Sequence, residues 1–149
     1  MCIVKDEIIT SHVGHMLIQI KEMLKDAGIP YEAAYYYVGI FSQNPNGFSI
    51  FAREDRNGII ISALGWHEKF WNAKEAFEKI LLLLSEKARL KAQYRGNVPY
   101  RWTLQYQQRR NWIDQSSVGL SFYPLFEKET VVFLQNHFVA SKLKDPVPS

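Results

Sequence analysis

Apolar residues recur at helical spacing near the start of the chain. Over residues 11–27 they fall on one side of a helix, at Val13, Leu17, Ile20, Leu24 and Ala27. Apolar side chains three and four residues apart share one helical face, so this segment predicts an amphipathic helix. Its expected start is an N-cap at residue 11, and the glycine at residue 28 ends it.

A second helical pattern begins at Asn72, with Glu75 three residues later in the arrangement of a capping box. One apolar face then follows, formed by Phe77, Ile80, Leu81, Leu84 and Ala88. This periodicity predicts a largely buried helix that runs to about Gln93 and stops at Gly96, because glycine adopts the left-handed conformation at little cost.

The end of that helix has an alternative. Residues 95–98, with Gly96 and Asn97 at the centre, also suit a tight hairpin turn that pairs residues 89–95 with residues 98–104. In that register Lys91 lies opposite Trp102 on one face of a sheet, where a cation-π contact can form. The long apolar periodicity before residue 89 favours the helix over the hairpin.

Strand patterns occupy most of the remaining chain. Residues 48–54 and 59–64 flank an Asn57-Gly58 tip, which is typical of a β-hairpin. Residues 100–106 alternate aromatic or apolar with polar positions, as in a strand with one buried face. Further strands are expected at residues 118–122 and 130–138.

The element order is therefore α-β-β-α-β-β-β, which indicates the α+β class. We expect an antiparallel sheet of about five strands, a hairpin plus a three-stranded meander, with two main helices on one face. Residues 1–140 are expected to form a single domain. Residues 141–149 contain Pro146 and Pro148 among polar residues and are expected to be a flexible tail.

Cysteine use and hydropathy bear on the cellular compartment. The chain of 149 residues has a single cysteine, Cys2, which is typical of a reducing environment. The first residues lack the apolar run of a secretory signal, and the longest strongly apolar stretch, residues 80–84, is too short to cross a bilayer. We therefore expect a soluble cytoplasmic protein that does not bind membranes.

Charge is distributed unevenly along the chain. Residues 87–113 contain seven of the 18 Lys and Arg residues, none of the 15 Asp and Glu residues, and five aromatic residues. The seven cations are Lys87, Arg89, Lys91, Arg95, Arg101, Arg109 and Arg110. Basic residues interleaved with aromatic ones are typical of surfaces that bind small anions or single-stranded nucleic acid.

The strand pattern divides this segment. Arg101 alternates with Tyr100, Trp102 and Tyr106, so it points to the opposite face of the sheet. Arg109 and Arg110 fall in a polar connection, where a solvated turn is the ordinary explanation. The candidate anion contacts that remain together are Lys91 and Arg95, near the strand that begins at Tyr100, with Arg101, Trp102, Arg109 and Arg110 flanking them.

Signals for catalysis or metal binding are weak. Trp66, His67 and Glu68 lie between the hairpin and the second helix, where a His-Glu pair beside tryptophan can serve acid-base chemistry. His12 and His15 share a polar helix face that is better explained by solvation, so no metal is predicted. Phosphate loops, dinucleotide fingerprints and paired cysteines are absent, so no cofactor is predicted either.

Several strands carry apolar residues on both faces. Phe51 opposes Ile50, and Val132 opposes Val131 and Phe133. Two helices on one face leave the other free, unless residues 29–46 fold over it. We therefore expect an interaction domain that binds a protein partner or forms a homodimer through its sheet. Binding of an anion or single-stranded nucleic acid is the alternative, and an enzyme ranks third.

Overall fold

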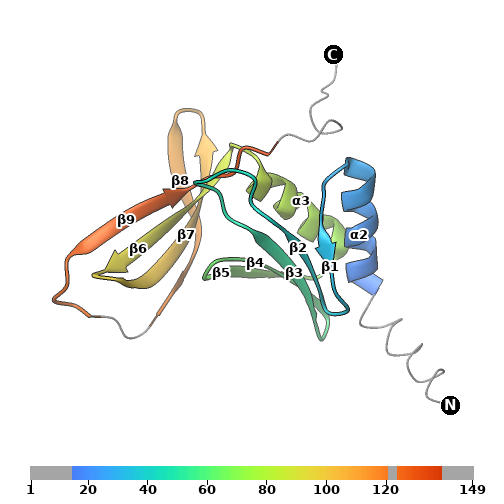
Figure 1. Cartoon of the computed structure of the whole chain (residues 1–149), viewed down its shortest axis with the longest axis horizontal. Helices are drawn as coiled ribbons and strands as arrows, with labels where there is room; N and C mark the ends of the chain where they lie inside the picture. Colours follow the sequence, from blue (N-terminus) through green and yellow to red (C-terminus); the bar gives the residue numbers. More distant parts are fainter. Residues whose placement is uncertain (1–14, 121–123, 139–149) are drawn as a thin grey trace.

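The computed structural model describes residues 15–120 and 124–138 and confirms the α+β class (Figure 1). Its elements follow the predicted order of a helix, a set of strands, a second helix and a second set of strands. The strands form two antiparallel sheets, one of five strands and one of four, rather than a single sheet. The expected C-terminal tail lies outside the described residues.

Sheet A is an antiparallel meander in which each strand pairs with the next one along the chain. Its five strands are β1 (Glu32–Ala33), β2 (Tyr37–Ile40), β3 (Ile50–Asp55), β4 (Gly58–Ala63) and β5 (Trp66–Phe70). The pairing of Asp55 with Gly58 confirms the hairpin predicted from the Asn57-Gly58 tip. Residues 29–46 extend this sheet with β1 and β2 and do not cover it.

The two helices pack on one face of sheet A. Helix α2 (His15–Ala27) buries Leu17, Ile20 and Leu24, as its sequence pattern predicts. Helix α3 (Ala73–Leu84) starts at the predicted cap, where the Asn72 side chain accepts a hydrogen bond of 2.9 Å from the Glu75 backbone N–H. The predicted start of the first helix lies outside the described residues.

The predicted extension of the second helix to Gln93 is wrong, and the hairpin alternative is right. Helix α3 ends at Leu84, and the chain enters strand β6 (Ala88–Arg95), which turns at residues 96–97 into strand β7 (Val98–Gln108). Apolar residues at 84, 88 and 92 are four apart. Residues four apart lie on one face of a helix and also on one face of a strand, so this spacing fits both. The positive φ of Gly96, 61°, serves the hairpin turn.

Sheet B has the order β8-β7-β6-β9. Strand β8 (Asn111–Gly119) occupies a region where a polar connection was expected, and β9 (Glu129–Leu134) is shorter than the predicted strand over residues 130–138. Both are edge strands, exposed at most positions, so a buried face does not impose a strict apolar alternation on them. Part of the strand expected at residues 118–122 lies outside the described residues.

A shared core joins sheet B to sheet A and the helices. The Trp66 side chain is fully buried, and its Nε1–H donates a hydrogen bond of 2.9 Å to Ser116 Oγ on β8. Gly65, in the turn after β4, lies against the indole ring of Trp102 on β7. The buried side chains Leu90 and Leu104 complete this junction from β6 and β7.

Candidate functional site

Sheet B has one face in the core and one face turned away from it. Along β6, Ala88, Leu90 and Ala92 are fully buried, whereas the alternating side chains of Arg89 and Lys91 point to the other side. We call this other side the outer face of sheet B. It carries Arg89, Lys91, Arg101, Gln105, Trp112 and Phe133, drawn from all four strands.

Arg89 is the most constrained cation of the outer face. Its guanidinium carbon lies 4.2 Å from the ring centroid of Trp112 and 4.0 Å from that of Phe133. Its Nε–H donates a hydrogen bond of 2.7 Å to Gln105 Oε1, and the Gln105 amide donates one of 2.8 Å to Asp114. Burial lowers the pKa of Arg89 from its usual value, but a guanidinium remains charged in proteins.

The two terminal amino groups of Arg89 make no hydrogen bond with any residue in the ranges 15–120 and 124–138. Aromatic rings flank the guanidinium on both sides, and Gln105 fixes its inner edge. A guanidinium edge held in this way presents two parallel N–H donors, which match the spacing of the oxygens of a carboxylate or phosphate.

A register shift changes the residue on β7 that lies opposite Lys91. The shift falls between Gln93 and Tyr94, so Lys91 pairs with Thr103 and not with Trp102 as the hairpin alternative predicted. Trp102 points to the core side, against Gly65, and the predicted cation-π contact with Lys91 does not form. Lys91 therefore stays on the outer face beside Arg89, and forms no ion pair with any described residue.

Arg95 belongs to a different group of side chains. Its Nη2 lies 3.9 Å from Glu129 Oε2, and its guanidinium lies 5.7 Å from the Tyr100 ring. Hydrogen bonds from the Tyr100 hydroxyl and the Gln93 amide lower the pKa of the Glu129 carboxyl. The Glu129 carboxylate thus faces Arg95 and offsets part of its positive charge. This weakens the predicted anion site in which Arg95 and Lys91 act together.

The remaining predicted cations lie along the same sheet. Arg101 is exposed on the outer face, opposite Gly119. Arg109 and Arg110 form the turn between β7 and β8, next to the end of the sheet that holds Trp112, and both are exposed. The structure therefore brings Arg101, Arg109 and Arg110 onto the sheet that holds Arg89, a residue that the sequence pattern had assigned to a helix end.

The group Trp66, His67 and Glu68 does not converge on one site. Trp66 is buried in the core, and the exposed His67 points to the opposite face of β5. Glu68 Oε1 lies 3.4 Å from Lys79 Nζ, which also donates a hydrogen bond to the Tyr106 hydroxyl. Sequence reasoning missed this Lys79 and Tyr106 contact because no local pattern connects a helix with a distant strand.

Strand β9 is the open edge of sheet B, and no described element lies along its free side in Figure 1. Gly96 N–H donates to the Lys128 carbonyl, which continues the ladder between β6 and β9. Hydrogen bonding alternates along an antiparallel strand, so residues 130, 132 and 134 bond to β6. The backbone N–H and C=O groups of Glu129, Val131 and Phe133 consequently point away from the sheet.

Side chains along this open edge are apolar on both faces. Val131, Val132 and Phe133 are 39%, 40% and 45% exposed, and no charged residue stands between Glu129 and Leu134. The edge ends at Gln135, whose N–H donates a hydrogen bond of 2.8 Å to the Asn46 carbonyl. The open edge is therefore defined as residues 129–134.

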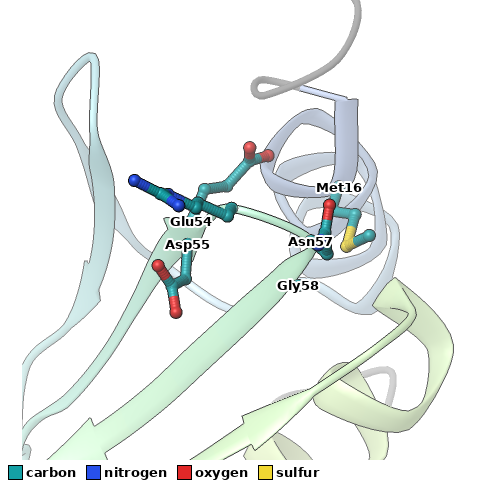
Figure 2. Close-up of a pocket in the computed structure, with 6 residues that line it drawn as sticks. Met16, Glu54, Asp55, Asn57 and Gly58 are labelled. Carbon is teal, nitrogen blue, oxygen red and sulfur yellow. The ribbon is translucent and has the colours of Figure 1, made fainter.

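A pocket of about 290 Å³ lies between α2 and the turn of the β3–β4 hairpin (Figure 2). Glu54 lines it and accepts a hydrogen bond of 2.8 Å from the Leu17 N–H in α2. Burial raises the pKa of the Glu54 carboxyl and outweighs the opposite effect of that hydrogen bond. Its neighbour Asp55 pairs with Lys69 at 3.1 Å, and His15 at the start of α2 is close enough to Glu54 to favour its charged form.

Other classes of site find little support in the described part of the chain. Residues 15–120 and 124–138 contain no group of three His, Cys, Asp or Glu side chains arranged to hold a metal ion. None of the helices in these ranges has the length and apolar character needed to span a bilayer. No protein-family model, curated protein or solved structure matches this chain.

Proposed function

We propose that this protein is an interaction domain that forms a homodimer by strand addition at the open edge of β9. The observation that carries the proposal is the outward direction of the backbone groups of Glu129, Val131 and Phe133 on an apolar strand. An extended edge with unpaired N–H and C=O groups is a template for another strand. A cytoplasmic location, expected from the single cysteine, is compatible with this role.

A second copy of the chain fits the edge through a two-fold axis at Val131. Antiparallel pairing about that residue places Val131 opposite its symmetry mate and Glu129 opposite Phe133 of the other copy. All three outward residues of each copy then exchange hydrogen bonds. The pairing ends before Gln135, whose N–H is already bonded to Asn46.

The side chains of the edge support the same arrangement. Val131 and Phe133 lie on the outer face and Val132 on the core side, so a second strand covers apolar surface on both faces. Proteins commonly protect edges with lysine, proline or a bulge. Residues 130–134 contain none of these, although one lysine and two acids lie within residues 124–129.

The other edge of sheet B is protected, so this sheet can pair with a second chain only through β9. On β8, Gln105 pairs with Asp114 and Leu104 pairs with Ser116, so Gln115 is an unpaired bulge. A bulge interrupts the regular spacing of the backbone groups that a further strand requires. Pairing through β9 alone is isologous and therefore closes as a dimer.

Sedimentation velocity over a range of protein concentrations tests this proposal. We expect a monomer–dimer equilibrium that changes little between low and moderate salt, because the interface is made of backbone hydrogen bonds and apolar side chains. A monomer at every concentration would contradict the proposal. An interface that dissociates as salt rises would indicate contacts between charged side chains instead.

A further inference from the structure

We infer that the outer face of sheet B binds single-stranded nucleic acid, with backbone phosphates held by Arg89, Lys91 and Arg101. This inference goes beyond dimer formation and does not depend on it. It rests on where these three cations lie, on the partners that they have, and on the aromatic ring next to them.

Arg89 provides a prepared phosphate contact. Trp112 and Phe133 lie at 4.2 and 4.0 Å from its guanidinium carbon, and Gln105 holds Nε at 2.7 Å. The side chain is therefore ordered before any ligand binds, and little conformational entropy is lost on binding. Its free edge carries two parallel N–H donors, which suit the two oxygens of a phosphodiester.

Lys91 and Arg101 extend this contact along the sheet. Lys91 is next to Arg89 on the same face of β6, and Arg101 projects from the neighbouring strand. At the other end of β7, Arg109 and Arg110 form the exposed turn. The eight residue steps from Arg101 to Arg109 span roughly 26 Å at about 3.3 Å per step, which is long enough for several nucleotides.

Two acids neighbour these cations, and one of them, Glu129, interacts electrostatically with Lys91. Asp114 accepts a hydrogen bond of 2.8 Å from Gln105, so it orients the residue that holds Arg89. Glu129 is bonded to Gln93 and Tyr100 and lies near Arg95. Arg101, Arg109 and Arg110 form no ion pair within residues 15–120 and 124–138 and are available to an anionic polymer.

Trp112 favours a nucleic acid over an acidic peptide. One face of its ring is covered by the Arg89 guanidinium, and its other face makes no ring contact with the described residues. Single-stranded nucleic acids bind where cations follow the phosphates and an aromatic ring stacks on a base. An acidic peptide supplies the negative charge but has no base to stack on this ring.

Fluorescence anisotropy of a labelled oligodeoxythymidylate of about 12 nucleotides, titrated with the full chain, tests the inference. Each phosphate contact on single strands contributes about 0.7 to the slope of log affinity against log salt, so three contacts predict a slope of about −2. The measurement covers about 50 to 200 mM salt. Absence of binding at about 100 µM protein and low salt, the weak end of non-specific binding, would overturn the inference.

Variants identify the contacts. Arg101→Gln and Lys91→Gln each should reduce the magnitude of the salt slope by about 0.7 and lower the affinity. The matched control is Arg53→Gln, an exposed arginine on sheet A, which should change neither quantity. Arg89→Lys should keep the slope but weaken binding several-fold, because lysine lacks the planar fork. Equal effects of Arg53→Gln and Arg101→Gln would overturn the assignment to this face.

Two further measurements separate the nucleic acid from other ligands and from the dimer. Polyglutamate of similar charge should compete poorly with the oligonucleotide, and stronger binding of polyglutamate would instead identify an acidic protein ligand and overturn the inference. Val131→Pro should change sedimentation while leaving the salt slope per chain unchanged. Loss of the slope in that variant would show that the phosphate contacts require the dimer.

Discussion

The guanidinium carbon of Arg89 lies 4.0 Å from the ring centroid of Phe133, so the charged face of sheet B and its open edge share one residue. Phe133 covers Arg89 with its side chain and directs its backbone N–H and C=O away from β6. The proposed dimer edge and the proposed nucleic-acid face are therefore adjacent. They can be tested separately, because a substitution at Val131 affects the dimer edge and a substitution at Arg101 affects the nucleic-acid face.

Val131→Pro should weaken dimer formation strongly while leaving the monomer folded. The Val131 N–H points away from β6, so proline removes no hydrogen bond within the monomer. In the two-fold pairing it removes two intermolecular hydrogen bonds of roughly 1 kcal/mol each, which weakens the dimer at least about 30-fold. Sedimentation measures the dimer, and circular dichroism checks the fold.

A second pair of variants guards against a local disturbance by proline. Val131→Lys places a charge on the open edge, whereas Ile113→Lys places the same charge on β8 at a residue of similar exposure, 39% against 44%. Only the change at Val131 should weaken the dimer. Equal weakening by both would point to general charge repulsion.

Asn136→Ala should destabilise the protein by about 2 to 4 kcal/mol, because it leaves buried backbone groups without partners. The Asn136 side chain accepts a hydrogen bond of 3.0 Å from the Phe48 N–H and donates to the Phe48 and Leu83 carbonyls at 3.1 and 3.0 Å. Urea unfolding measures the loss. The exposed Asn97, changed to alanine, is the control, and a similar loss there would refute this explanation.

Gly65→Ala should destabilise the junction of the two sheets by about 1 to 3 kcal/mol. A Cβ atom at Gly65 would lie 2.4 Å from the indole ring of Trp102, which is too large and rigid to move aside easily. At Gly119 the nearest atoms would be 3.5 Å away, an ordinary contact. Thermal unfolding of the two alanine variants should therefore differ, and equal midpoints would contradict the close packing.

Glu54→Gln should raise the free energy of unfolding more at neutral pH than at acid pH. The folded-state pKa of Glu54 is raised above 4.5, mainly by burial, so its stabilising contribution is complete below the unfolded pKa and is lost as pH rises through the folded pKa. Glutamine keeps an oxygen that can accept the Leu17 N–H and removes the cost of ionisation. Urea unfolding at acid and neutral pH measures this difference.

Asp55→Asn provides the contrast of opposite sign. Hydrogen bonds from the Arg56 N–H and from Lys69 lower the folded-state pKa of Asp55 below 3.8. The contribution of its charge is present above the unfolded pKa and is lost as pH falls through the folded pKa. The asparagine variant should therefore be less stable than the wild type at neutral pH. A change of the same sign in both variants would contradict the assigned causes.

Local patterns in the sequence predict the elements that bury one regular face. The β3–β4 hairpin, α2 and the Asn72 cap of α3 all follow from spacing, turn residues and capping. The end of α3 does not, because the apolar positions Leu84, Ala88 and Ala92 satisfy the helical and the strand period together.

The candidate site was harder to predict than the fold because it depends on contacts between distant residues. The contact of Arg89 with Trp112 and Phe133 joins residues from β6, β8 and β9. The register shift near Tyr94 decides which side chain of β7 lies beside Lys91. Strand β8 is exposed on both faces, so its sequence lacks the alternation that marks a buried strand. The clustering of positive charge in residues 87–113 was nevertheless visible in the sequence.

Amide hydrogen exchange along β9, measured at several protein concentrations, tests the proposed dimer most directly. The amides of residues 130, 132 and 134 bond to β6 and should be protected at every concentration. Those of Glu129, Val131 and Phe133 should exchange rapidly in the monomer and become protected as the dimer forms. Rapid exchange of these three amides at all concentrations, including those at which a dimer sediments, would contradict pairing through β9.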